Sequence, residues 1–263
     1  LALDTILQRH LVLRTVFREA VKGLEQWVMP APTFHYDYGE PELAGLDDVV
    51  LATNNTVKKW MNASFDLING PLVRGLLIGA DSDCPAFILS AHHIAIDGWS
   101  LNVLMQELVS LYSGETIDPL PLQYSDFARW QQTHLQPRLA ELANTWVSEL
   151  SDAPTVSTLP PEYPRPLTQS HRGASLYRRL SPELINRLDA MAQTRHCTLY
   201  MALFAAYAAT LTESAGQFDM VIGIDIANRH YPGVAPLIGF FVNQLPLRCQ
   251  LQPAFNGLDL LAE

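Results

Sequence analysis

Two adjacent histidines, His92 and His93, are the residues of this 263-residue chain whose types and spacing best suit chemistry. They stand in the stretch SAHHIAIDGWS and are followed closely by Asp97 and Gly98. An unperturbed histidine titrates at about pH 6.5, so it can accept or donate a proton near neutrality. Successive strand side chains point to opposite faces, so only one of the two rings can face a given cavity if a strand runs through both. The alternation of apolar residues does not choose between them.

Three interpretations of the histidine pair can be compared. Metal ligation is disfavoured, because the two rings would point in opposite directions and no HxH or HxxxH pair supplies the usual geometry. A buried pair held by backbone hydrogen bonds, with Asp97 merely capping the next helix, would need no function. The third is proton transfer or hydrogen bonding by one histidine at an open cleft. The residues themselves leave the last two open.

A change of period places the histidines at the end of a strand. Residues 72–78 and 86–92 are typical of two strands joined by a loop. From Leu101 onward apolar residues recur at helical spacing, and Gly114 can end that helix. The stretch at Asp97 and Gly98 is therefore predicted to turn from the strand into the helix.

The same kinds of pattern predict the other elements. The N-terminus has the spacing of an amphipathic helix, and Ser181 is a predicted N-cap. A buried helix is expected after Thr198. Strands are predicted over residues 13–17, 25–29, 33–37, 174–180 and 219–227, and further helices over 43–62, 124–134 and 137–150.

A proline-rich stretch divides the chain. Residues 153–166 carry five prolines, too many for a helix or a central strand, and are typical of an extended connector. We therefore predict a first domain over residues 1–152, a connector over 153–170 and a second domain beginning at 171 and running to 263.

Composition disfavours several classes of function. Against 27 acidic residues the chain has 17 Lys and Arg, and its net charge of -10 repels nucleic acid and anionic membranes. The longest uncharged apolar stretch, residues 199–211, is too short to cross a bilayer. The three cysteines, Cys84, Cys197 and Cys249, form no CxxC pair, which predicts neither a disulfide framework nor a metal site and favours a cytoplasmic protein.

Five sequence blocks resemble one family. HHIAIDG matches the HHxxxDG motif of the condensation domains of nonribosomal peptide synthetases. RHLVLRTVF is similar to that family's RHxxLRTxF block and YSDFARW to its YxDYAxW block. VIGIDIANR resembles IGxPxANR, and IGFFVNQLPLR resembles GxFVNxxxLR. The order and spacing of five blocks make the resemblance specific, whereas HxxxDG alone would be weak.

The resemblance implies an α/β (α+β) class and a two-lobed fold like that of chloramphenicol acetyltransferase, with a tunnel between the lobes. The chain would hold the N-terminal lobe with its HHxxxDG motif and the beginning of the C-terminal lobe, and we expect it to be incomplete at both ends. The predicted boundaries at 152 and 171 then separate these lobes.

The resemblance also implies roles for residues. His93 would face the tunnel as the catalytic group. Asp97 would pair with Arg229 of the other lobe, and a bidentate contact would hold the loop that carries His93; a solvated surface position is the alternative for this arginine. His92 and Gly98 would support the same site.

Two further residues, Asn243 and Gln244, follow an apolar run. They either line the tunnel or stand at the end of a strand. Trp99 and Trp130 are expected to be core aromatics.

The implied activity is amide bond formation between a donor acyl or peptidyl thioester and an acceptor aminoacyl thioester. Both substrates would be tethered to phosphopantetheine arms of carrier proteins, which with neighbouring synthetase domains are the expected partners. No cofactor or metal is expected to bind directly. The alternatives are a catalytically silent docking domain of the same fold, a related acyltransferase and an ester-forming domain. An epimerization domain is disfavoured by the Gly-Trp-Ser that follows Asp97.

Overall fold

A computed structural model describes residues 1–21, 23–30, 33–39, 54–83, 85–156, 159, 163–164, 166–170, 173–174 and 176–251. The chain forms two compact units, of which the first combines Leu1–Leu139 with Ile226–Asn243 and the second combines Ala140–Asp225 with Gln244–Glu263. Both units contain helices and strands, as the predicted class requires. The predicted lobe boundaries stay a prediction, because compact units and lobes are different divisions of a chain.

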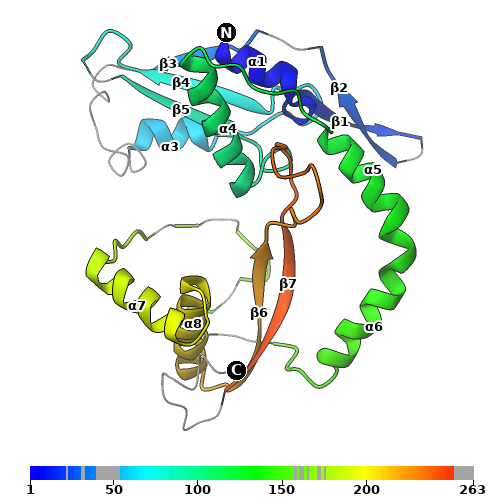
Figure 1. Cartoon of the computed structure of the whole chain (residues 1–263), viewed down its shortest axis with the longest axis vertical. Coiled ribbons are helices and arrows are strands. Elements are labelled where there is room, and N and C mark those ends of the chain that lie inside the picture. The colour runs from blue at the N-terminus through cyan, green and yellow to red at the C-terminus, as the bar shows by residue number, and fades with distance from the viewer. Residues whose placement is uncertain are drawn as a thin grey trace. The chain divides into compact units, whose positions relative to one another are not determined.

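The first unit contains a mixed three-stranded sheet with the order β3-β4-β5 (Figure 1). β4 and β5 run antiparallel, with Val73 opposite Ala91, while β3 runs parallel to β4. The strands predicted over 72–78 and 86–92 are confirmed, although β5 ends one residue before His92. Their bounds are Tyr36–Gly39 for β3, Val73–Ile78 for β4 and Ala86–Ala91 for β5.

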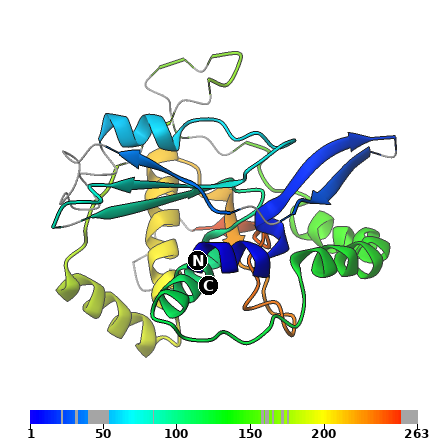
Figure 2. The same cartoon turned by 90° about the horizontal axis from the view of Figure 1, so that it is seen from above.

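A separate hairpin precedes this sheet in the chain (Figures 1 and 2). β1 (Thr15–Ala20) pairs antiparallel with β2 (Gly23–Val28). The strand predicted from residue 13 begins later, because Leu11–Arg14 forms a 3₁₀ turn in front of it. The turn residue Lys22 lies outside the described residues.

Helices complete the first unit. The predicted N-terminal helix, the helix after the histidines and the helix at 124–134 are all present. The helix predicted over 43–62 is confirmed for its end only, because residues 43–53 lie outside the described residues. The bounds are Ala2–Arg9 for α1, Asn55–Met61 for α3, Gly98–Tyr112 for α4 and Tyr124–His134 for α5, with a 3₁₀ turn at Gln136–Arg138.

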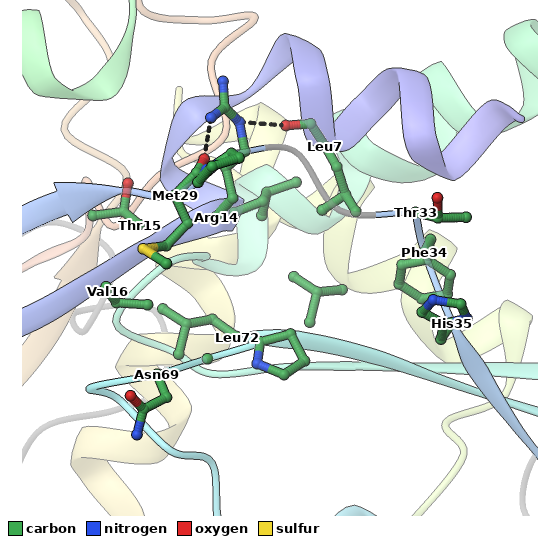
Figure 3. A pocket seen from close by; sticks show the side chains of 15 residues that line it. Leu7, Arg14, Thr15, Val16, Met29, Thr33, Phe34, His35, Asn69 and Leu72 are labelled. Atoms are coloured by element: carbon green, nitrogen blue, oxygen red, sulfur yellow. Dashed lines mark hydrogen bonds between the residues drawn. The ribbon is translucent and has the colours of Figure 1, made fainter.

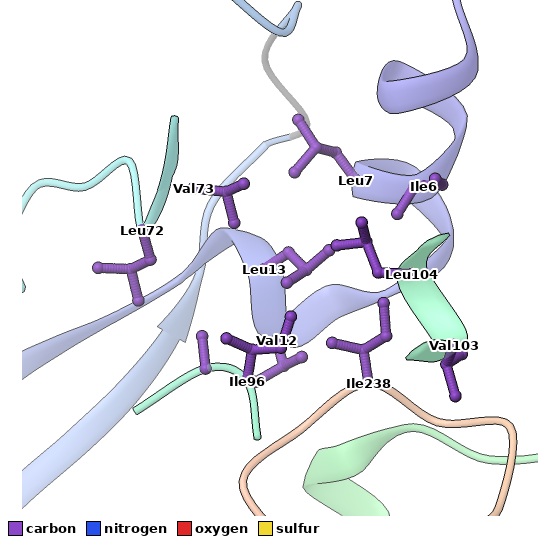
Figure 4. Close-up of a cluster of buried hydrophobic side chains, with 11 residues drawn as sticks. Ile6, Leu7, Val12, Leu13, Leu72, Val73, Ile96, Val103, Leu104 and Ile238 are labelled. Atoms are coloured by element: carbon purple, nitrogen blue, oxygen red, sulfur yellow. The ribbon is translucent and has the colours of Figure 1, made fainter. Parts of the chain in front are cut away.

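The main core of the first unit joins α1, α4 and the loop at residue 238 (Figure 4). Ile6, Leu104 and Ile238 are each 1% exposed in this cluster. Burying three such aliphatic side chains stabilises the unit by about 1.5–3 kcal/mol each. The core therefore fixes the segment around residue 238 against the two helices.

A cavity of about 340 Å³ adjoins this core in the first unit, among α1, β1 and the start of β4 (Figure 3). Arg14 donates hydrogen bonds across one wall to the carbonyl oxygens of Leu7 and Met29. Neither histidine of the pair lines this cavity, and Asp97 and Arg229 do not line it either.

The second unit holds α6 (Leu139–Glu149), α7 (Pro182–Thr194), α8 (Leu199–Ala215) and a two-stranded sheet of β6 (Asp219–Ile226) and β7 (Asn243–Gln250). The predicted cap is present, since Ser181 Oγ accepts a hydrogen bond from the amide of Leu184 at 3.2 Å. Arg248 on β7 binds Asp219 on β6 through two nitrogens, at 3.0 and 2.6 Å.

Two predictions for the second unit are wrong. The described residues of 174–180 form no strand, because no other described strand pairs with them there. α8 was expected to be buried, but only Ala202, Ala208 and Thr212 are buried. Four of its large apolar side chains are more than a third exposed, because the described elements of this unit leave much of the helix uncovered: Tyr200, Met201, Leu203 and Tyr207.

Candidate active site

The chain leaves the sheet directly before the two histidines. The amide of His92 donates to the carbonyl of Leu72, the residue before β4, at 2.9 Å, just beyond the last strand pair of Val73 and Ala91. The amide of Ala95 then donates to the carbonyl of His92 at 3.0 Å and closes a turn. Because this turn begins at His92, the two imidazoles enter different surroundings without a strand running through them.

His92 is engaged in local structure. Its ring is half-buried, and Nδ1 accepts a hydrogen bond from the amide of Ile94 at 3.1 Å. The ring meets Phe65 edge to face with 5.7 Å between centroids. The guanidinium of Arg74 lies 4.2 Å from the centroid of the Phe65 ring. Arg74 also donates hydrogen bonds to the last carbonyl oxygens of α3. The ring of His92 is therefore held in place by local contacts.

His93 has the opposite character. Its side chain is exposed, and within the described part of the chain neither ring nitrogen has a hydrogen-bond partner. Its imidazole meets the ring of Phe240 edge to face, with centroids 5.1 Å apart and an angle of 84°. Both nitrogens are therefore available to a substrate.

Asp97 caps α4 and is 3% exposed. Oδ1 accepts from the amide of Ser100 at 2.8 Å and from Arg229 at 3.0 Å, while Oδ2 accepts from the amide of Phe241 at 2.9 Å. Burial alone would raise the pKa of Asp97, but the hydrogen bonds from Ser100 and Phe241 and the charge of Arg229 outweigh it and hold that pKa below its usual value. The carboxylate is ionised and fully engaged.

Arg229 has the carboxylate partner that the resemblance implies. Its side chain is 2% exposed, which excludes the alternative of a solvated surface arginine. The expected bidentate contact is wrong, because only one terminal nitrogen binds Asp97. The other donates to the carbonyl oxygens of Val234 and Leu237, at 3.1 and 2.6 Å. Burial lowers the pKa of Arg229 more than Asp97 raises it, yet an arginine stays charged at neutral pH.

The arginine and the aspartate belong to the same compact unit, because Ile226–Asn243 groups with the first unit. The guanidinium also lies 4.1 Å from the centroid of the Phe241 ring. The pair thus fastens the segment that follows Arg229 to the start of α4.

Ser100 and Tyr124 bind the same segment, and neither was predicted from the sequence as a site residue. Ser100 Oγ accepts from Arg229 at 2.6 Å and from the amide of Gly239 at 3.0 Å, and it donates to the carbonyl of Gly239 at 2.8 Å. Tyr124 donates its hydroxyl to the carbonyl of Phe240 at 2.9 Å. A Cβ on Gly239 would collide with the Tyr124 ring. Tyr124 lies in the YSDFARW block and Ser100 follows the HHIAIDG block by two residues, which was the available signal.

His10 is a third residue that sequence reasoning did not identify. It is 1% exposed, and its Nδ1 accepts from the amide of Ile238 at 3.3 Å. Its Nε2 lies 2.8 Å from Glu107, which also accepts from Arg9 at 2.9 Å. Burial would raise the pKa of Glu107, but the contacts with His10 and Arg9 hold it below its usual value. The RHxxLRTxF block was the signal for this contact.

The remaining predicted site residues are less constrained. Gly98 is the first residue of α4, and a Cβ there would meet no atom within 4 Å, so packing supplies no reason for glycine. Asn243 and Gln244 are exposed and begin β7, and a role in lining a tunnel stays a prediction. Trp99 is 48% exposed and not a core residue, since its indole donates to the carbonyl of Ala235 at the surface.

No group of three potential metal ligands occurs among the residues that the structure describes. In the same residues, no helix has the length and apolar character needed to span a membrane. Cys249 is a free thiol, and Cys84 lies outside the described residues.

The family model described as condensation domain matches residues 1–262. The chain belongs to the condensation domains of nonribosomal peptide synthetases. This domain is 36% identical over 267 residues to malpinin synthetase of Mortierella alpina, covering 99% of this chain and 3% of that protein. It is also 36% identical over 271 residues to phosphinothricin tripeptide synthetase PhsC of Streptomyces viridochromogenes, covering 100% of this chain and 25% of that protein.

The condensation domain thus spans a small part of the curated relatives that it matches. Among solved structures, it superposes on the X-domain from teicoplanin biosynthesis with a TM-score of 0.81 at 24% identity, covering 99% of this chain and 59% of that chain. This likeness shows the fold, and the predicted family and its chloramphenicol-acetyltransferase-like fold are confirmed.

Proposed function

We propose that this condensation domain joins a donor acyl or peptidyl thioester to the amine of an acceptor aminoacyl thioester, with His93 as the catalytic group. One observation carries the proposal: His93 presents an exposed imidazole with no protein partner for either nitrogen among the described residues. The neighbouring motif groups, Asp97 and His92, are engaged in holding the turn.

In the proposed reaction the amine nitrogen attacks the thioester carbonyl. A C–N bond forms, the C–S bond breaks, and the thiol leaves with a proton while the amine loses one. An α-amine has a pKa of about 7.7–8.0, so freeing it at neutral pH costs only about 1 kcal/mol. A strong base is therefore unnecessary, and His93 would hold the amine and accept its proton as the bond forms.

Proton transfer by a positioned side chain typically contributes about 10²- to 10⁴-fold in rate. Holding two tethered substrates together would supply much of the rest, since effective molarity contributes about 7–11 kcal/mol in favourable cases. His93 is thus proposed as a positioning group and base, and no covalent intermediate on the protein is required.

Asp97 is not proposed as the base. Both of its oxygens accept hydrogen bonds, it is buried, and its lowered pKa makes it a poor proton acceptor. Asp97 is proposed to support the site structurally, through its contacts with Arg229 and the amide of Phe241. His92 and Gly98 are proposed to support the same site, His92 through its local hydrogen bond to Ile94 and Gly98 as the first residue of α4.

The proposed partners are donor and acceptor carrier proteins, each bearing its substrate on a phosphopantetheine arm, together with neighbouring synthetase domains. No cofactor is proposed to bind the domain directly, and the cytoplasm is the proposed compartment. Asn243 and Gln244 are proposed to line the path of a substrate arm.

Single-turnover transfer tests the proposal. The full protein that contains this chain is mixed with donor and acceptor carrier proteins loaded with a panel of aminoacyl groups, and products are read by mass spectrometry. An amide product from at least one pair is expected. Carrier binding without any product would favour the silent docking domain, and products formed only with hydroxy acceptors would favour the ester-forming alternative.

A further inference from the structure

Phe240 is an exposed aromatic residue whose ring lies against the imidazole of His93. It is 41% exposed, so burial in the core does not account for a large apolar side chain here. The two rings meet edge to face at 84° with 5.1 Å between centroids, which is the favoured arrangement for such pairs. Phe240 stands at the position that the GxFVNxxxLR block leaves open.

The backbone around Phe240 is held on both sides. The amide of Gly239 donates to Ser100 Oγ at 3.0 Å, and the amide of Phe241 donates to Asp97 Oδ2 at 2.9 Å. Between them, the carbonyl of Phe240 accepts from Tyr124 at 2.9 Å. Three consecutive residues are thus fixed to α4 and α5, and the ring of Phe240 is held in place while staying partly exposed.

His93 needs such a restraint. The other motif histidine is oriented by a hydrogen bond to Nδ1, but neither nitrogen of His93 has a partner in the described part of the chain. A contact that uses only the edge or face of the imidazole fixes the ring and leaves both nitrogens available. An oriented group loses less entropy when it meets the reacting atoms.

From this geometry we propose that Phe240 is a positioning residue that orients the imidazole of His93. The proposal rests on the proposed function, because it concerns the same catalytic group. Phe240 acts through His93 and takes no proton itself. Losing the contact should lower kcat by about tenfold, the upper range for an aromatic pair, while KM stays within about twofold.

Three variants test the proposal in the full protein that contains this chain. Phe240→Leu removes the aromatic contact and keeps an apolar side chain, whereas Phe240→Tyr keeps the ring. Phe87→Leu is the matched control, because Phe87 is 40% exposed in the same unit and its ring meets Tyr36 instead. Thermal unfolding is measured for each variant to show that it is folded.

Two measurements are made on each variant. The first is kcat and KM with the carrier-loaded substrate pair that gives product with the wild type. The second needs no activity: the rate at which diethyl pyrocarbonate modifies His93, followed by mass spectrometry, with His92 as the internal reference.

Phe240→Leu is expected to lower kcat about tenfold and to raise the modification rate of His93, while Phe240→Tyr and Phe87→Leu stay at wild-type values. Wild-type kcat and modification rate in Phe240→Leu would overturn the proposal, as would a Phe240→Tyr variant as impaired as Phe240→Leu. If the wild type itself forms no product, the proposed function fails, and the modification rates alone decide whether Phe240 restrains His93.

Discussion

His10 and His93 both contact the segment of residues 238–241, and the protein uses them in opposite ways. His10 is 1% exposed, and its two nitrogens meet the amide of Ile238 and the carboxylate of Glu107. His93 is exposed, touches Phe240 through its ring, and has no partner for either nitrogen among the described residues. The difference shows which histidine is part of the framework and which has hydrogen-bonding capacity left for a substrate.

The same contrast extends to the acidic groups. Asp97 and Glu107 are both buried. Glu107 binds Arg9 at the end of α1, and Asp97 binds the start of α4, Arg229 and the amide of Phe241. A buried charge whose partners are complete is costly to disturb, whereas an exposed side chain is cheap to remove. Substitutions of the buried groups should therefore lower stability, whereas substitution of the exposed His93 should lower activity.

The largest stability effect is expected for Asp97→Ala. It leaves the buried guanidinium of Arg229 without its carboxylate and removes the cap of α4, at a cost of about 3–5 kcal/mol of unfolding free energy. Chemical denaturation measures this loss, with Asp118→Ala as the control because Asp118 is exposed. A fully stable but inactive Asp97→Ala protein would mean that Asp97 acts in the chemistry, which would contradict its assignment as a structural group.

A smaller loss is expected for His10→Ala. The amide of Ile238 and the carboxylate of Glu107 lose a buried partner, which should cost about 2–3 kcal/mol. His10→Asn should retain part of this, since its Oδ1 can replace Nδ1 as acceptor. His134→Ala, at an exposed position, is the control. Equal stability of His10→Ala and wild type would show that His10 is not part of the framework.

Acid should weaken the framework. The pKa values of Asp97 and Glu107 are lowered in the folded protein, so their stabilising effect is complete above the unfolded values of about 3.9 and 4.3 and is lost as the pH falls through the folded values. Unfolding free energy should therefore fall as the pH decreases below about 5. Asp97→Asn should have a shallower pH dependence, and an unchanged slope would contradict the assigned ion pair.

The smallest effect is expected at the surface. Trp99→Phe removes the indole donor to the carbonyl of Ala235 on a half-exposed ring, and the carbonyl can bond water instead. The cost should be about 0.5–1 kcal/mol in unfolding free energy. A loss of unfolding free energy as large as that of Asp97→Ala would show that Trp99 is a structural residue like Asp97.

The local part of this site was predictable from the sequence. A change from strand to helical period predicted the bend, and Asp97 ahead of an apolar helix predicted its cap. The pairing of Asp97 with Arg229 could not be predicted from local patterns, because 132 positions separate the two residues and only the family resemblance connected them. Its detailed geometry differed because the carbonyl oxygens of Val234 and Leu237 take the second guanidinium nitrogen, and a sequence does not show which carbonyl oxygens surround a side chain.

Other features depended on long-range packing. The role of His10 rests on contacts with Ile238 and Glu107, far along the chain, so its place in the RHxxLRTxF block was a signal that did not reveal its partners. Residues 174–180 have strand-like composition but lack a described partner strand. Propensity is a weak guide where the tertiary environment decides.

The most direct test of the account compares His93→Ala with wild type in one preparation of the full protein that contains this chain. Single-turnover amide formation between loaded carrier proteins and thermal unfolding are measured together. The account predicts a loss of about 10²- to 10⁴-fold in rate with an unchanged unfolding temperature, because His93 is exposed and holds nothing by hydrogen bonds. A variant that transfers at the wild-type rate, or one that is inactive because it is unfolded, would contradict it.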